Sequence, residues 1–312
     1  MNIFNFVKTF KTEKACINYI KDLRLENGIT CKKCNKKEKH YWLKSVNKFQ
    51  CSVCRSRTNI KSGTIMEKSK LSIQMWLTAI HLITTTKKSF SALELQRQLG
   101  ISCYETVWYM LLKIRIMMGK RDSKYTLKGD IEVDDAFFET YNDRIQKDQH
   151  GQKILKRGRG SQRQSKVLVM VESTPKYHEI KNKKKRVMGY VKMSVVDSLD
   201  SKTINYELNK GLDKESTIYT DAYKGYNKAL DVVDGHIQDV VEPKEAMIKL
   251  PWVHTIISNS KKMTLGIHHF VKSKYLQSYL SEFCYKLNRR NFEYRDMFDG
   301  LALACIDSSW KD

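Results

Sequence analysis

The sequence predicts a mixed α/β protein in three parts: a small metal-binding module, a helical segment and a sheet-containing domain. Three observations predict this order. Two Cys-x-x-Cys pairs lie near the start, apolar residues at helical spacing follow them, and short β-branched runs begin at about residue 128. With 312 residues and 41% hydrophobic content, the chain is long enough to bury more than one core.

The composition favours a polyanionic partner. Lys and Arg number 57 against 34 Asp and Glu, a formal charge of +23 that is spread over the whole length. This excess makes nucleic acid the first candidate, with a basic proteome or a merely soluble surface as the alternative. No apolar run approaches the roughly 18 residues of a membrane span, and MNIFNFVKTFKTEK lacks the pattern of a signal peptide. We therefore expect no membrane partner and a cytoplasmic protein, nucleoid-associated when bound to DNA.

The first part, residues 1–60, contains a short helix over residues 10–24 and then four paired cysteines. Their spacing is that of a zinc ribbon: Cys31, Cys34, Cys51 and Cys54. Because cytoplasmic thiols stay reduced, paired cysteines there are more often metal ligands than disulfides. We expect them to hold a structural Zn²⁺ in a closed tetrahedral shell. The single cysteines stand in apolar settings and are expected in the core: Cys16, Cys103, Cys284 and Cys305.

The second part, residues 61–125, is predicted to be helical. MEKSKLSIQMWLTAIHLITTT carries apolar residues at helical spacing, and ALELQRQLG and ISCYETVWYMLLKIRIMM continue the pattern. The Gly100-Ile101-Ser102 turn separates the last two segments, with Ser102 placed to cap the second. This is the sequence form of a helix-turn-helix that contacts DNA, although an ordinary helical hairpin gives the same pattern.

The third part, residues 126–312, reads as a mixed sheet with helices. GDIEVDDAFFE, KVLVMVES and RVMGYVKMSVVD are three predicted strands, followed by a helix near 200–210, the strand STIYTD and a weaker strand HIQDVV. Helices are expected around 254–265 and 272–288. This is the order of a ribonuclease-H-like sheet. Between the first two strands, the basic stretch over residues 146–166 is expected to be a loop that could meet phosphate.

Two aspartates stand out in this part. Asp130, Glu132 and Asp134 alternate along one strand and therefore share a face, with Asp134 expected near the strand's end. Asp221 directly follows the apolar STIYT. Two such carboxylates could share Mg²⁺ or Mn²⁺ ions and serve phosphodiester chemistry. Strand-end aspartates are also common as helix caps and turn formers, which is the alternative.

Several motifs extend this pattern along nearly the whole chain. They are TEKACINYI, CKKC, CSVC, SGTIMEKSKL, IEVDDAFFE, YTDAYKGY, PWVHTIISNSKK, LGIHHFVKSKYLQSYLSEF and CYKLNRR. Together they resemble the zinc-ribbon-bearing DDE transposases of bacterial insertion sequences, the ISXO-like group. The resemblance implies metal-dependent strand cleavage and strand transfer on double-stranded DNA, at terminal inverted repeats and in target DNA. It also implies a homo-oligomer, at least a dimer, that brings two DNA ends together. Asp134 and Asp221 match the family's first two acids.

The third acidic position departs from the family pattern, which usually has Glu followed seven residues later by Lys. Aligned on Gly266, these positions fall on His254 and Lys261, which two helical turns would place on one face. Asn259 is the competing candidate, because an amide oxygen is a harder ligand than imidazole. It lies five positions, or about 140°, from His254 on a helix. Imidazole suits Mn²⁺ better than Mg²⁺.

The resemblance also implies contacts to DNA. Lys261 or Lys262 would meet a phosphate near the scissile bond, and Arg289 and Arg290 would flank the DNA path. Glu282 is expected to be structural, although it remains a spare carboxylate if His254 is inert. The sequence thus predicts an insertion-sequence transposase. A catalytically inactive zinc-ribbon DNA-binding regulator is the alternative, favoured by the missing third carboxylate, and a repair or resolving nuclease would differ only in its substrate.

Overall fold

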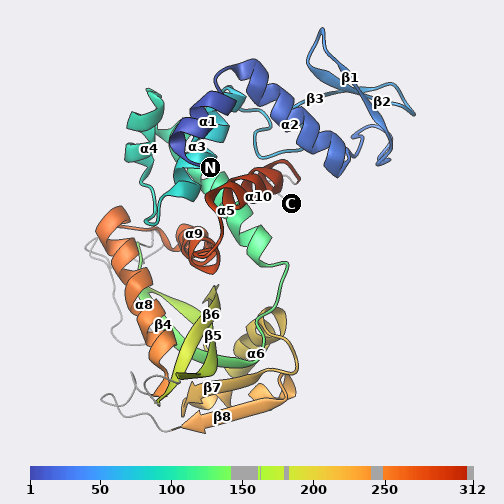
Figure 1. Ribbon diagram of the computed structural model, residues 1–312. Helices are drawn as coiled ribbons and strands as arrows, with labels where there is room; N and C mark the ends of the chain where they lie inside the picture. Colours follow the sequence, from blue (N-terminus) through green and yellow to red (C-terminus); the bar gives the residue numbers. More distant parts are fainter. Residues whose placement is uncertain (142–160, 162, 179–182, 240–248, 308–312) are drawn as a thin grey trace, which may run out of the picture. The chain divides into compact units, whose positions relative to one another are not determined.

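The computed structural model describes residues 1–141, 161, 163–178, 183–239 and 249–307 (Figure 1). The chain divides into two compact units, Met1–Arg121 with Asn291–Asp312, and Asp122–Arg290. The last helix therefore lies outside the unit expected over residues 126–312. The reason is its apolar face, because α10 (Tyr294–Asp307) buries Phe298 and Leu301 in the first unit. Most of the expected basic loop over 146–166 lies outside the described residues.

The core of the first unit forms around α3 (Ile73–Thr85), whose apolar residues recur at helical spacing and are buried at Trp76, Leu77, Ile80 and Ile83. The helices α1 (Ile3–Thr9) and α2 (Glu13–Asn27) belong to the same unit, and α2 packs on α3. Hydroxyl caps start two of these helices, since Thr12 accepts from the Ala15 N–H and Ser72 from the Met75 N–H.

Two further helices, α4 (Ala92–Leu99) and α5 (Tyr104–Asp122), are joined at the turn that the sequence predicts. Gly100 ends α4 in the left-handed conformation, with φ of +63°, which only glycine adopts at no steric cost. Ser102 does not cap α5 as expected: the helix begins at Tyr104, and the Ser102 carbonyl instead accepts a hydrogen bond from Gln96 (2.8 Å). DNA contact by these helices stays a prediction.

A small antiparallel sheet forms the ribbon, in the order β1 (His40–Leu43), β2 (Lys48–Cys51), β3 (Arg57–Asn59). Its core is one aromatic pair, because Phe49 is fully buried with its ring centroid 4.9 Å from that of Trp42. Three of the single cysteines are buried as predicted, Cys16, Cys284 and Cys305. Cys103 is exposed, because it directly precedes α5 and does not lie on the buried face of that helix.

The second unit is built on a five-stranded mixed sheet in the order β6-β5-β4-β7-β8. The strands are β4 (Asp130–Glu139), β5 (Gln164–His178), β6 (Lys183–Val196), β7 (Thr217–Asp221) and β8 (Gly235–Asp239). The first three pair antiparallel, whereas β7 runs parallel to both β4 and β8. Each predicted strand therefore exists, the weakly predicted last one included.

Helices cover both faces of this sheet (Figure 1). On one side lie α8 (Pro251–Met263), which packs on β4, and α9 (Leu276–Asn288), which packs on β6, in one apolar cluster with Ala136 and Phe138 of β4. On the other side α6 (Ser201–Gly211) buries Ile204 and Leu208 in one apolar cluster with Ile131 and Val133. Because side chains alternate along a strand, Glu132 and Asp134 share the face of Ala136 and Phe138 and point toward α8.

Candidate functional site

Two tight turns bring the four paired cysteines together. In each turn the residue after the second cysteine, Asn35 or Arg55, is left-handed, and its N–H donates to the carbonyl of the first cysteine (2.8 and 3.0 Å). The ligand atoms of Cys31, Cys34, Cys51 and Cys54 all lie within 4.8 Å of one another, the one such group among the described residues.

The spacing of the sulfur atoms fits a zinc ion. The Sγ atoms of Cys31 and Cys54 are 3.5 Å apart, and those of Cys34 and Cys51 are 3.8 Å apart. A tetrahedral shell with Zn–S bonds of about 2.3 Å needs about 3.8 Å between sulfurs. The Ser56 hydroxyl lies 3.1 Å from the Cys31 sulfur, and this hydrogen bond, together with the backbone N–H groups of the turn, lowers the pKa of the Cys31 thiol to about 5, which favours the ligating thiolate.

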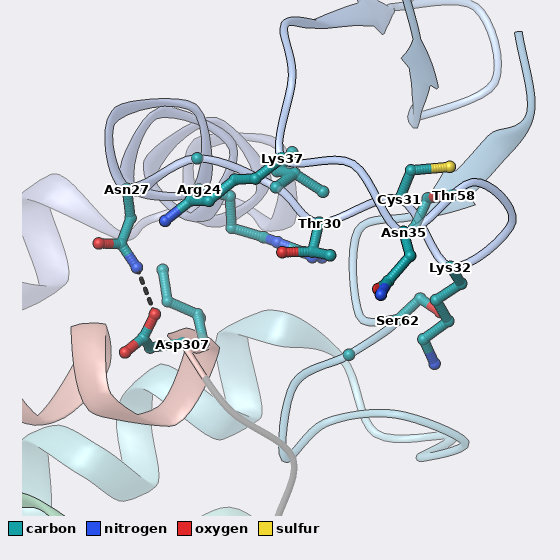
Figure 2. Close-up of a pocket in the computed structure, with 14 residues that line it drawn as sticks. Arg24, Asn27, Thr30, Cys31, Lys32, Asn35, Lys37, Thr58, Ser62 and Asp307 are labelled. Atoms are coloured by element: carbon teal, nitrogen blue, oxygen red, sulfur yellow. Dashed lines mark hydrogen bonds between the residues drawn. The ribbon is translucent and has the colours of Figure 1, made fainter. Parts of the chain in front are cut away.

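A cavity of about 230 Å³ lies between the end of α2 and the first cysteine turn (Figure 2). Two of the cations that line it already have partners within the chain. Arg24 donates to the Ile60 carbonyl, and Lys32 forms an ion pair with Glu67 (2.7 Å). The cavity therefore reads as a gap between helix and ribbon, and we assign it no ligand.

The two predicted aspartates lie on neighbouring parallel strands. The register pairs Glu132 of β4 with Tyr219 of β7, and its continuation sets Asp134 level with Asp221. Asp134 is not at the end of its strand as expected, because β4 continues to Glu139. The edge arises instead from β7, which ends at Asp221.

The electrostatics of this pair fit a cation site. Burial, together with the negative charges of Asp135 and Asp221, raises the pKa of the Asp134 carboxyl to about 7. Carboxylate oxygens in such a setting are ligands of the type that Mg²⁺ and Mn²⁺ accept. The described side chains around Asp134 do not form a group of three ligand atoms within 4.8 Å, so the arrangement provides two carboxylates and not a closed cage.

His254 and Asn259 differ in where α8 places them. The Nδ1 atom of His254 is 3.5 Å from Oδ2 of Asp134, and its buried Nε2 has no hydrogen-bond partner among the described residues. Burial lowers the pKa of this imidazole, so it is neutral at neutral pH. Asn259 is exposed further along the helix. The structure thus places His254, and not Asn259, beside the first aspartate.

The lysine that follows seven residues later shares this side of α8. The Lys261 ammonium lies 5.8 Å from the centroid of the Phe138 ring, and its positive charge lowers the pKa of Asp134. Lys262 is exposed. The interval of seven therefore puts His254 and Lys261 on the face that packs on β4.

The two arginines expected along a DNA path both bond to groups of the chain itself. Arg289 is buried, its guanidinium 2.6 Å from the Asp122 carboxylate and 3.7 Å from the Tyr285 ring centroid. Arg290 is exposed, but it donates to the carbonyls of Met188 and Gly189 (2.6 and 3.1 Å). Both guanidinium groups bond within the chain, and contact of either arginine with DNA stays a prediction. Glu282 is buried beside Lys286 (3.0 Å), in line with a structural role.

Sequence reasoning missed the role of Glu132, which is completely buried. One oxygen of its carboxylate accepts the N–H groups of Trp252 and Val253, at 2.8 and 2.9 Å, at the first turn of α8. The other accepts the Ser173 hydroxyl (2.5 Å). Because Leu250 at the N-cap has no side-chain acceptor and Pro251 has no N–H, Glu132 supplies the cap from the neighbouring strand.

These features define a zinc-ribbon protein whose mixed α/β unit carries a pair of carboxylates at a sheet edge. Residues 126–288 match the family described as the ISXO2-like transposase domain, and residues 11–57 match the transposase zinc-ribbon domain. The chain belongs to the ISXO2-like transposase family, since the first match alone covers more than half of it.

The chain is also similar to individual proteins. An uncharacterized protein in transposable element ISH50 of Halobacterium salinarum is 23% identical over 243 residues, covering 75% of this chain and 76% of that protein. A pre-cleavage Mos1 transpososome and a Mos1 paired-end complex with the left transposon end share 10% identity with it. They cover 74% and 72% of this chain and 76% and 78% of theirs, with TM-scores of 0.28 and 0.23. Within the described ranges, no helix is both long and apolar enough to cross a membrane.

Proposed function

We propose that this chain is an insertion-sequence transposase that binds terminal inverted repeats and performs metal-dependent cleavage and transfer of DNA strands. The observation that carries the proposal is the parallel register of β4 and β7, whose continuation sets Asp134 level with Asp221, with His254 3.5 Å from Asp134. Family membership supports a transposase. The sheet order, three antiparallel strands followed by two parallel ones, supports a ribonuclease-H-like catalytic unit.

Asp134 and Asp221 would hold the catalytic Mg²⁺ or Mn²⁺. When bound, such ions activate a water or a 3′-hydroxyl and stabilise the leaving oxygen at phosphorus. Because the pKa of Asp134 is raised, its carboxyl would release a proton when a metal cation binds to it. His254 would be a third metal ligand or would orient the bound ions. An imidazole ligand would favour Mn²⁺ over Mg²⁺. Lys261 would contact a phosphate near the scissile bond, and exposed Lys262 the adjoining backbone.

The partners follow from the same reading. Double-stranded DNA supplies both the terminal repeats and the target, and a homo-oligomer, at least a dimer, would hold two ends together. The four-cysteine Zn²⁺ would be structural, because a closed all-sulfur shell has no open position. We place the protein in the cytoplasm, on the nucleoid when it is bound to DNA.

An inactive DNA-binding regulator is the second candidate, and one observation favours it. The third position is an imidazole, and the nearby carboxylate of Glu132 is already occupied by the first turn of α8. It therefore does not replace the missing acid. This reading predicts binding to the terminal repeat without cleavage.

Cleavage of a labelled duplex that carries a candidate terminal repeat tests the proposal. We expect the native chain to nick it with Mg²⁺ or Mn²⁺, and Asp134→Asn and Asp221→Asn to lower the rate by more than about 100-fold, since even residues behind metal ligands cost about 10- to 100-fold. His254→Ala should be slow and Asn259→Ala close to native. Exposed Asp231→Asn is the matched control. Binding without any cleavage in the native chain would sink the enzyme proposal in favour of the regulator.

A further inference from the structure

Phe270 is the most exposed large apolar residue of the described chain, with 86% of its surface accessible. It follows α8 through a π-helical turn, η5 (Thr264–His268). Single exposed apolar residues are ordinary on protein surfaces, but Phe270 differs from the others in its backbone support and in its basic surroundings.

The backbone holds Phe270 outward on a fixed support. Val271 is buried in the core below α8, its carbonyl accepts the Tyr141 N–H (2.9 Å), and the Ser273 N–H donates to the Tyr141 carbonyl (3.1 Å). On the other side His269 has φ of +52° and ψ of −59°, and the Phe270 N–H donates to the His268 carbonyl (2.6 Å). This is a γ-turn of the rare, strained kind, which persists only where the surroundings impose it.

The surrounding sequence is basic throughout. From residue 246 to residue 281 there is no Asp or Glu, while there are five Lys and three His. Lys261 and Lys262 precede the turn, and Lys272 and Lys274 follow it. A single aromatic ring among cations is the pattern by which proteins bind the bases and phosphates of single-stranded nucleic acid.

The position of Phe270 along the fold connects it to the acidic site. Contacts between α8 and β4 proceed in step, from Trp252 with Glu132, through His254 with Asp134, to Lys261 with Phe138. The same progression continues to Val271 beside Tyr141, just past the end of β4. A DNA strand that follows the basic residues of α8 away from Asp134 would thus arrive at Phe270.

We propose that Phe270 is a stacking platform for an unpaired DNA base next to the cleavage site. The inference rests on the proposed function, since DNA is its ligand. A second copy of the chain is the competing occupant, but a stable protein interface buries about 800 Å² on each partner. Leu265 is the other large apolar residue that is substantially exposed among the described residues of this acid-free stretch.

Binding to single-stranded oligothymidylate, measured by fluorescence anisotropy without divalent metal, tests this proposal apart from cleavage. Phe270→Ala should weaken binding about 5- to 150-fold, the range for the loss of one base–aromatic stack. The affinity of Phe270→Ala for a fully paired duplex of equal length should equal that of the native chain. Phe270→Leu should behave like the alanine variant because it lacks a π face, whereas Phe270→Trp should retain binding and show fluorescence quenched by the oligonucleotide.

Phe4→Ala is the matched control, because Phe4 is also 82% exposed but belongs to the other unit. Light scattering on each variant reports the oligomeric state. Native-like binding of single strands by both Phe270→Ala and Phe270→Leu would overturn the proposal. Loss of the oligomer in these variants would overturn it as well, in favour of a contact between copies. A chain that stacks bases but never cuts would contradict only the proposed enzyme activity.

Discussion

Among single residues, Glu132 connects folding to the site most directly, because a strand carboxylate caps the helix that carries His254. We expect Glu132→Gln to lower the free energy of unfolding by about 1–3 kcal/mol, the cost of poorly satisfied buried donors. The amide oxygen can still accept both N–H groups of α8, but the amide nitrogen then replaces the oxygen that accepts the Ser173 hydroxyl and lies 3.8 Å from Arg186, so donors face donors there. Urea unfolding measures this change.

Glu139→Gln is the matched control, since Glu139 is exposed at the end of the same strand. If the cap positions His254, Glu132→Gln should also lower kcat for cleavage with little change in KM, and Glu132→Asp should not restore it because the shorter side chain falls short of α8. Equal stability of the Glu132 and Glu139 variants would contradict the capping role.

At the level of elements, the ribbon depends on its metal more than on its core. Apart from Phe49 and Trp42, few apolar side chains hold β1, β2 and β3 together. Cys51→Ser, or removal of zinc by a chelator, should therefore unfold the ribbon and leave the second unit intact. Hydrogen exchange would show loss of protection over residues 31–59, together with loss of bound zinc measured by atomic emission.

Cys103→Ser provides the control for the zinc prediction, because Cys103 is an exposed single cysteine outside the ribbon. It should keep both the zinc and the exchange protection of the native chain. Protection of residues 31–59 that survives complete removal of zinc would mean that packing alone holds the ribbon.

Elements with a local signal were predictable from the sequence. The alternation of side chains along β4 and the two Cys-x-x-Cys pairs depend only on residues close together in the sequence. The strand and the ribbon therefore appear where expected. Features that depend on distant segments were not predictable. Asp134 lies at an edge of the sheet because β7 ends beside it. Arg289 is buried because it forms an ion pair with the buried carboxylate of Asp122. The cap of α8 by Glu132 likewise joins residues 120 positions apart.

For the whole molecule, the division into two units raises the question of whether they unfold together. The chain enters the second unit at Asp122 and leaves it after Arg290. The buried pair of Asp122 and Arg289, joined by Asn288 (3.1 Å to Asp122), fastens these two ends within that unit. Removing one partner of a buried ion pair leaves the other charge uncompensated, at a cost of about 3–5 kcal/mol.

Asp122→Asn should therefore speed hydrogen exchange in β6 and α9 and leave α2 and α3 protected. Leu77→Ala is the reciprocal variant, since it opens a cavity in the core of the first unit at a similar cost of about 2–5 kcal/mol. It should expose α2 and α3 alone. If each variant raises hydrogen exchange only in its own unit, the two units unfold independently, because the buried contacts that each substitution removes lie within one unit. If either variant instead raises exchange equally in both units, the chain unfolds as one cooperative body and the division is geometric only.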